Sequence, residues 1–272
     1  MKKIAINFSG ALRSFEYCAD SIMNNIVNEL RKEYDIYMFG HFWILKEVGD
    51  MEYSMKWKID YKNSFDRVQK FGFNDYCVEE YNQEWEKKII SGCYGNIVLD
   101  EYEKIENKEE KMNYKSYAVN SMGMYFKILE CQKLMEEYEI ANNIKVDYVI
   151  RMRPDFYWNE KFPLNIVKKI TNNDILLVKD SYCVRAKWMG NDKFFMGTSS
   201  VMKKYSRAYE KIKYFFDNKI RIEGQNIAKY YIEDLKLNIL FFGDEKTYDK
   251  ATGKFIKQLL VRNKKLSSDT DQ

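Results

Sequence analysis

Two arginines and an aspartate alternate in residues 151–155 (RMRPD), directly after the apolar run VDYVI. Such a run predicts a buried strand, and the ligands of an open α/β sheet bind outside the carboxyl ends of its strands. Alternation in an extended segment puts Arg151, Arg153 and Asp155 on one side, and the proline favours extended backbone at the residue before it. Guanidinium groups suit a diphosphate, and a carboxylate suits a divalent cation or a sugar hydroxyl. The alternative is a buried ion-pair network with a structural role.

Two segments nearer the N-terminus also follow predicted strands. Ser9 and Gly10 end the apolar run KIAINF, where a glycine lets the backbone approach a ligand closely and Arg13 offers a charged donor to phosphate. His41 follows the run DIYMF and could hydrogen-bond a base, a ribose or a sugar, with Trp43 as a stacking surface. The structural alternatives are an ordinary strand-to-helix turn for the first segment and a buried histidine for the second.

Composition excludes several classes of protein. The 272 residues include 45 Lys and Arg against 41 Asp and Glu, and a net charge of +4 is too small to indicate a nucleic-acid partner. The single histidine excludes metal sites built on two or more histidines. Five cysteines without a C-x-x-C pair argue against a zinc ribbon or a disulfide framework and favour a reducing compartment. Because no apolar run approaches the roughly 20 residues of a membrane span, and the N-terminal run is too short for a signal peptide, we expect a cytoplasmic protein without a transmembrane segment.

The order of apolar patterns predicts an α/β protein with a mixed, mainly parallel central sheet flanked by helices. Strands 3–8 and 35–39 enclose a helix over about 12–32, and the longest helical pattern covers about 113–142. The elements predicted after residue 145 are strands at 146–150, 175–178, 194–196 and 237–242 and helices at about 199–218 and 223–235.

The weakest pattern lies between about 45 and 110. It contains a helical piece at 64–70, a candidate strand at 96–99 (NIVL) and a charged run that predicts a solvated loop or helix end. We expect one domain over 1–265, with about 45–110 as a variable helical insertion and 266–272 as a flexible tail.

Taken in order, these motifs resemble a known family. They are FSGALRSF, DIYMFGHFW, YFKILECQKL, DYVIRMRPDFYW, DKFFMG at 192–197, and IEGQ at 222–225. The chain resembles the GT-A-type nucleotide-sugar glycosyltransferases of bacterial surface-glycan loci and large DNA viruses. The resemblance covers most of the chain and is weakest across about 45–110. It implies a GT-A-like, Rossmann-like fold.

The resemblance also implies a reaction, the transfer of a sugar from a nucleotide-diphosphate sugar to a glycan acceptor in surface polysaccharide or glycoprotein glycan synthesis. It places the donor against Ser9, Gly10, Arg13, His41, Arg151, Arg153 and Asp155. GT-A enzymes usually hold a divalent metal with D-x-D, whereas this chain has RMRPD there. We therefore expect Mn²⁺ or Mg²⁺ at Asp155, with the two arginines supplying part of the positive charge.

An inverting transfer needs a carboxylate that accepts the proton of the acceptor hydroxyl. Asp192 is the first candidate because glycines on both sides of it permit a tight backbone, and the alternative is a turn residue. Glu223 is the second candidate because a helix N-terminus favours its ionised form, and the alternative is an ordinary helix-start acid. Both inverting and retaining chemistry are compatible with the sequence.

The missing D-x-D leaves open a non-catalytic nucleotide-sugar or carbohydrate-binding protein. A nucleic-acid binder is disfavoured because acidic residues are spread through the chain almost as evenly as basic ones. The partners we expect are a nucleotide-sugar donor and a glycan or lipid-linked glycan acceptor, and the second acceptor brings peripheral contact with a membrane surface.

Overall fold

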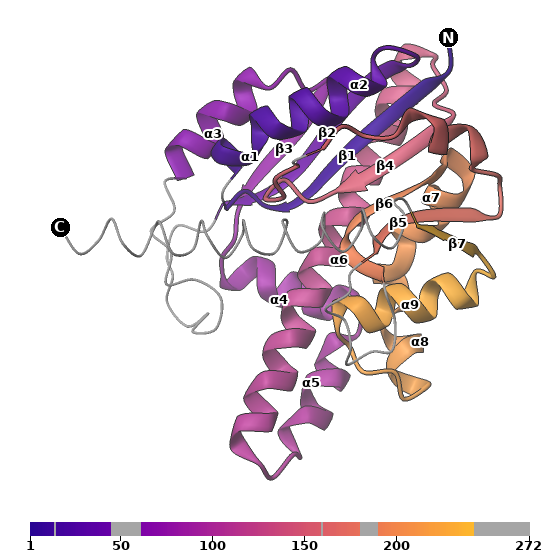
Figure 1. Ribbon diagram of the computed structural model, residues 1–272. Helices are drawn as coiled ribbons and strands as arrows, with labels where there is room; N and C mark the ends of the chain where they lie inside the picture. Colours follow the sequence, from indigo (N-terminus) through magenta and orange to yellow (C-terminus); the bar gives the residue numbers. More distant parts are fainter. Residues whose placement is uncertain (14, 45–60, 159, 180–189, 242–272) are drawn as a thin grey trace.

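A seven-stranded sheet forms the centre of the computed structural model, which describes residues 1–13, 15–44, 61–158, 160–179 and 190–241 (Figure 1). The strand order is β3-β2-β1-β4-β6-β5-β7. β1 pairs in parallel with β2 and β4, β2 with β3, and β5 with β7, whereas β6 runs antiparallel between β4 and β5. The predicted α/β class, with a mixed and mainly parallel sheet flanked by helices, is confirmed.

The strands are mostly short apolar runs that are buried on both faces, as a parallel sheet covered by helices requires. Their bounds are β1 (Lys3–Ala11), β2 (Asp35–Ile44), β3 (Asp75–Glu80), β4 (Tyr148–Met152), β5 (Asp174–Lys179), β6 (Gly190–Thr198) and β7 (Asn238–Phe241). The helices are α1 (Phe15–Ile22), α2 (Asn28–Leu30), α3 (Tyr61–Lys70), α4 (Gln83–Gly92), α5 (Gly95–Glu103), α6 (Lys108–Asn142), α7 (Ser199–Tyr205), α8 (Ile212–Asp217) and α9 (Gly224–Asp234). A π-helical turn (Met23–Val27) joins α1 to α2, and short 3₁₀ helices occupy Leu164–Lys169 and Ser206–Lys211.

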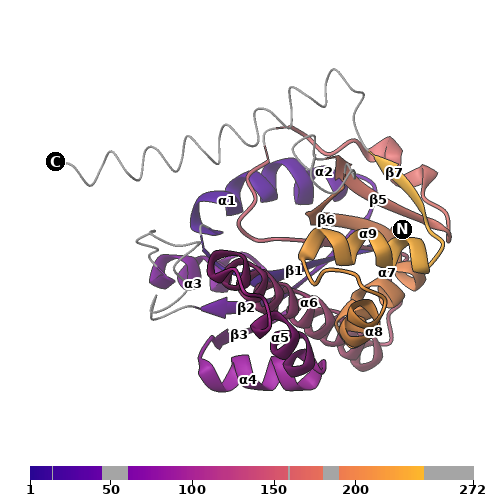
Figure 2. The same cartoon turned by 90° about the horizontal axis from the view of Figure 1, so that it is seen from below.

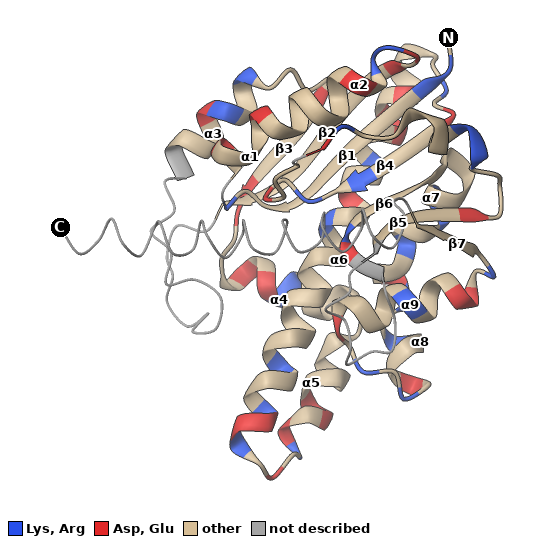
Figure 3. Ribbon diagram, in the orientation of Figure 1, with Lys and Arg blue, Asp and Glu red and all other residues tan. Residues whose placement is uncertain are grey.

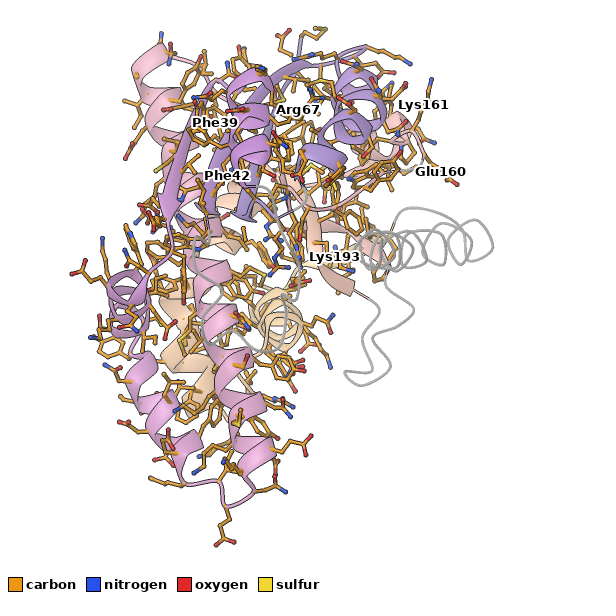
Figure 4. All side chains as sticks on the ribbon, turned by 90° about the vertical axis from the view of Figure 1, so that its left-hand side faces the viewer. Phe39, Phe42, Arg67, Glu160, Lys161 and Lys193 are labelled. Carbon is orange, nitrogen blue, oxygen red and sulfur yellow. The ribbon has the colours of Figure 1, made fainter. Side chains whose placement is uncertain are left out.

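Side chains alternate between two cores along each central strand. Phe8 and Phe42 belong to the core under α1, α2 and α3, whereas Phe39 and Val149 belong to the core under α4 to α9 (Figures 1 and 4). Residues with the same parity on neighbouring strands therefore face the same helices, and this decides which polar side chains meet.

The long helix α6 lies across the face of the sheet opposite to α1, α2 and α3 (Figure 2). Its start is capped by the side chain of Asn107, which accepts a hydrogen bond from the Glu110 amide at 3.0 Å. Asn143 ends it with φ of 51°, a left-handed conformation that asparagine tolerates better than most residues. Together with α5, the first turns of α6 project from the sheet as a helical hairpin (Figure 1). The predicted helix and its end are confirmed.

The described part of region 45–110 differs from the prediction in two ways. The candidate strand at 96–99 is wrong, because these residues lie in α5, whose buried Gly95, Val98 and Tyr102 follow the spacing of a helix. β3 was not predicted, yet it extends the sheet in parallel beside β2. The region is therefore only partly helical and adds a strand to the sheet. Residues 45–60 and the expected tail at 266–272 lie outside the described residues.

Two properties of the described residues bear on the remaining expectations. None of their helices is both long enough and apolar enough to cross a membrane. Acidic and basic residues are interspersed along α3, α6 and α9 (Figure 3). The second observation agrees with the even spread of charge in the sequence.

We predict that the stability of the fold depends on the face of α6 that meets the sheet. Ile128 is buried in the second core, whereas Ile140 on the same helix is 81% exposed. Ile128→Ala should lower the free energy of unfolding by about 2–5 kcal/mol, because it removes buried methyl groups and leaves a cavity. Ile140→Ala, the matched control, should change it by less than about 0.5 kcal/mol. Urea denaturation measures both, and equal losses would contradict this packing.

Candidate functional site

A cavity of about 280 Å³ opens at the edge of the sheet where β1 and β4 end. The chain passes from β1 to β2 on one side and later returns to β4 on the other, so the strand order reverses here, and open α/β sheets bind ligands at such points. Because β6 runs antiparallel to β4, it is the beginning of β6 that lies at this edge. The Arg153 amide donates to the Lys193 carbonyl there at 3.0 Å (Lys193 is labelled in Figure 4). Segments far apart in the sequence thus meet at one edge.

The cavity collects most of the residues that the sequence singles out. Eight of the nine predicted site residues line it, namely Ser9, Gly10, Arg13, Arg151, Arg153, Asp155, Asp192 and Glu223. The ninth, His41, is not among the lining residues. The sequence analysis missed the contribution of α6, which includes Tyr117, Asn120, Ser121 and Met124. These residues belong to no motif, and helical periodicity alone does not show which turn of a long helix faces a ligand.

Arg153 binds Asp155 through both carboxylate oxygens. The distances are 2.9 Å from Nε to Oδ1 and 2.7 Å from Nη2 to Oδ2, and Arg13 Nη1 lies 3.4 Å from Oδ2. Burial alone would raise the pKa of Asp155, but the charges of Arg153 and Arg13 outweigh it and hold this pKa well below its usual range. Burial lowers the pKa of Arg153, and the attraction of Asp155 more than reverses that effect. The pair is therefore ionised at every physiological pH.

Arg13 reaches Asp155 because the chain turns sharply after β1. Gly10 has a φ of 126°, which glycine adopts readily. Arg13 has a φ of 32°, a positive value that residues other than glycine rarely adopt. The hydroxyl of Ser64 on α3 bonds the Glu16 carboxylate and lies 3.3 Å from the Arg13 carbonyl, so α3 packs against this turn. The turn therefore brings the guanidinium group of Arg13, near the N-terminus, next to Asp155, which follows β4.

The surroundings of Asp155 do not fit a divalent metal ion. Both oxygens already accept hydrogen bonds from guanidinium groups, and a cation bound there would face the charges of Arg153 and Arg13. Among the described residues, the only set of three His, Cys, Asp or Glu ligand atoms within 4.8 Å of one another belongs to His41, Cys77 and Glu79. The carboxylates of the cavity form no such set. The expectation of Mn²⁺ or Mg²⁺ at Asp155 is therefore not supported by its geometry.

Arg151 is 1% exposed, although it lines the cavity. Its Nε donates to Ser9 Oγ at 3.0 Å, its Nη1 donates to the Asp192 carbonyl, and its Nη2 has no hydrogen-bond partner. Burial lowers the pKa of Arg151, and the nearby Asp192 carboxylate counteracts this only in part. Burying a cation with an unused donor is costly unless a ligand completes its hydrogen bonds. Arg151 therefore fits an anionic ligand.

Two carboxylates lie where α9 begins. Glu223 precedes the helix with extended backbone, and its Oε2 lies 3.5 Å from Arg221 Nε. Gly224 lets the Asp192 carboxylate approach, since a Cβ at this position would lie 3.2 Å from Asp192 Oδ2. The hydroxyl of Tyr125 on α6 donates to the Gly224 carbonyl at 2.8 Å and fixes this end of the helix. Asp192 and Glu223 therefore line the cavity together at the beginning of α9.

His41 lies instead in a buried polar cluster between β2, β3 and α6. Its Nδ1 is 2.9 Å from Lys127 Nζ, and the same ammonium group bonds the Glu79 carboxylate. Burial and the charge of Lys127 lower the pKa of His41 to about 3. Burial also lowers the pKa of Lys127, to about 8, although Glu79 opposes this. At neutral pH an uncharged imidazole accepts from the ammonium group, so His41 is not placed to contact a ligand in the cavity.

Comparison with known proteins adds no family assignment. No protein-family model matches the chain, and a search of the curated proteins found no matching sequence. A function must therefore be argued from the cavity itself, where three guanidinium groups and three carboxylates line the same space.

The titration of His41 provides a test of its burial. Because it is the only histidine, one imidazole signal reports it by nuclear magnetic resonance, and we expect no titration between pH 5 and pH 8. The unfolded chain takes up this proton near its ordinary pKa of 6.5, so acidification from pH 7 to pH 4 should reduce the free energy of unfolding by about 3 kcal/mol.

The variant His41→Gln is the matched control for this effect. In this variant the free energy of unfolding should no longer include the pH dependence caused by the imidazole, and should keep the pH dependence caused by other groups. A wild-type midpoint between pH 6 and pH 7 would show instead that the imidazole is hydrated.

Proposed function

We propose that the protein is a glycosyltransferase with a GT-A-like fold that transfers a sugar from a nucleoside-diphosphate sugar to a glycan. The observation that carries the proposal is the buried guanidinium group of Arg151, which has an unused donor and shares a cavity with Arg13 and Arg153. A diphosphate leaving group gains negative charge as its bond to the sugar breaks, and guanidinium groups aimed at its oxygens stabilise that charge.

The position of the cavity supports this proposal. It lies at the reversal of strand order in a mixed, mainly parallel sheet, which is the place where α/β sheets bind nucleotides. Gly10 follows Ser9 at the end of β1 and leaves the backbone open to close approach, with no atom within 4 Å of where a Cβ would be. Both features agree with the family that the sequence resembles.

In this proposal the protein supplies the positive charge that a metal bound to D-x-D supplies in the enzymes it resembles. Asp155 positions the guanidinium groups of Arg153 and Arg13 at the edge of the cavity. Ser9 and the Asp192 carbonyl position Arg151. Three planar cations held by hydrogen bonds present directional donors to a diphosphate, with no Mn²⁺ or Mg²⁺ needed at Asp155.

Asp192 is the proposed base of an inverting reaction. The acceptor oxygen would bond to the anomeric carbon as the bond from that carbon to the diphosphate oxygen breaks, and the hydroxyl proton would pass to the Asp192 carboxylate. Glu223 is the second candidate. Its ion pair with Arg221 already engages Oε2, one of the two carboxylate oxygens that could accept the proton. Tyr117, which lines the cavity from α6 and is 41% exposed, offers a face on which an acceptor sugar can pack.

Binding of nucleoside-diphosphate sugars tests the first part of the proposal. A thermal-shift panel of uridine-, guanosine- and cytidine-diphosphate sugars should contain at least one stabilising ligand, worth about 2.7 kcal/mol at one hundred times its Kd. EDTA should leave this shift unchanged, because the cations belong to the protein. Arg151→Met should weaken binding by about tenfold or more, since it removes charged hydrogen bonds.

The matched control is Arg207→Met, which removes an exposed arginine paired with Glu210 at 3.1 Å on the surface. It should bind as the wild type does. If no nucleotide sugar shifts the melting temperature, the proposal fails. If the shift requires Mn²⁺, the assignment of the charge to the arginines fails.

Turnover tests the second part. Asp192→Asn should retain binding of the nucleotide sugar and lose about 100-fold or more in transfer rate, because the amide cannot take the proton. Glu223→Gln is the paired variant and should lose much less. A larger loss in Glu223→Gln would exchange the two roles. Binding without turnover by the wild type, across a panel of glycan acceptors, would favour the alternative of a nucleotide-sugar-binding protein.

A further inference from the structure

A fully buried lysine lies between α6 and the edge formed by β2 and β3. Lys127 is 0% exposed, and its Nζ contacts His41 Nδ1 at 2.9 Å and bonds the Glu79 carboxylate. The same nitrogen lies 3.3 Å from the centre of the Trp43 ring and 5.9 Å from that of Trp85. An ammonium group has three donors, and here two go to Glu79 and His41 while the face of Trp43 lies where a third acceptor would be.

The groups around this ammonium are metal ligands by type. The ligand atoms of His41, Cys77 and Glu79 all lie within 4.8 Å of one another, and nitrogen, sulfur and carboxylate oxygen together are a set that Zn²⁺ accepts. Two of the three already bond Lys127 Nζ. A positive charge that already contacts two of the three ligands therefore belongs to the protein.

The cluster is also connected to the cavity. Trp43 lines the cavity, and its ring packs edge-on against Tyr81, another lining residue, with ring centres 5.3 Å apart. His41 pairs in register with Ser9 on β1, which binds Arg151. The ammonium group of Lys127 thus lies directly behind the aromatic part of the cavity wall.

We infer that Lys127 is a positioning residue, whose ammonium group occupies the place of a metal ion among His41, Cys77 and Glu79 and holds Trp43 in the cavity wall. The buried charge must keep its partners, because an unpaired ammonium group in an apolar interior is costly. The ring of Trp43 is one of those partners, so its position is fixed along with the ion pair. Only the identity of the ligand that meets this wall rests on the proposed function.

The variants that test this inference are Lys127→Met, which keeps much of the volume and removes the charge, and Lys127→Met with Glu79→Gln, which also removes the carboxylate left behind. The double variant keeps the test valid if the unpaired Glu79 alone destabilises the single one. The matched control is Lys133→Met on the same helix, where an exposed lysine pairs with Glu130 at 2.8 Å.

Addition of Co²⁺ tests whether Lys127 fills a metal-like site. Wild type and Lys133→Met should show no absorption band of thiolate bound to cobalt. Lys127→Ala, which keeps all three ligands and vacates the space of the ammonium group, should show this band and lose it when Cys77→Ser is added. A thiolate band in the wild type would overturn the inference, because the ammonium group would then not hold the site. Absence of the band in folded Lys127→Ala would overturn it as well.

Fluorine resonances of 5-fluorotryptophan test whether Lys127 positions Trp43. The chain has five tryptophans, and Trp43→Phe identifies the signal of Trp43. This signal should move and broaden in Lys127→Met and in the double variant, and stay in place in Lys133→Met. Trp158, which lies in the opposite core, is the internal control and should not change. An unchanged Trp43 signal would overturn the positioning role.

Affinity for the nucleoside-diphosphate sugar that binds best gives the functional readout. Lys127→Met should bind it about tenfold more weakly than the wild type, because Trp43 loses the cation that holds its ring in the cavity wall. Equal affinity would overturn the role of Lys127 and leave the proposed function standing. If the wild type binds no nucleotide sugar, the proposed function fails, and the cobalt and fluorine measurements still decide the role of Lys127.

Discussion

A guanidinium group withdrawn from water needs new hydrogen bonds and an opposite charge to replace its hydration. At the end of β4 this requirement is met in two different ways. Arg153 receives a carboxylate from two residues further along the chain, in a bidentate pair that fixes its plane. Arg151 receives only a hydroxyl from β1 and a carbonyl from β6, and one nitrogen has no partner. The first arginine therefore has a bound counter-charge before any ligand arrives, whereas the second keeps a buried donor for one.

The topology of the sheet supplies both hydrogen-bond partners of Arg151. Parallel pairing of β4 with β1 brings Ser9 beside Arg151, and antiparallel pairing of β4 with β6 brings the carbonyl of Asp192 to its other side. A parallel strand in the place of β6 would offer its far end at this edge, without Asp192. The antiparallel direction of β6 also brings the Asp192 carboxylate to the start of α9, where Gly224 leaves room for it. One antiparallel strand thus connects the cations of the cavity with its acids.

The sequence predicts this edge well because strand ends can be read from apolar runs, and parallel strands bring their ends together. Asp192 and Glu223 reach the cavity from segments that the resemblance marks. His41 does not, because β2 continues to Ile44 instead of ending near Phe39, so the imidazole lies within a paired strand and faces α6. The run at 96–99 is too short for strand and helix to be separated by its own pattern, and β3 carries too many polar residues to show a buried run. These errors arise where contacts made far along the chain outweigh local preference.

The two polar groupings on the α6 side of the sheet apply the same physical solution. In each, a side-chain cation is held by an acidic partner, since Arg153 pairs with Asp155 and Lys127 pairs with Glu79. A metal supplies two charges and accepts ligands of several kinds, whereas an arginine or lysine supplies one charge along fixed directions. Fixed directions require neighbours that hold the side chain. α6 contributes the cation Lys127 to one grouping, and Tyr125, which anchors the start of α9, to the other. The helix that covers both groupings is therefore part of the site as well as of the core, and this explains why the residues lining the cavity from α6 carry no motif of their own.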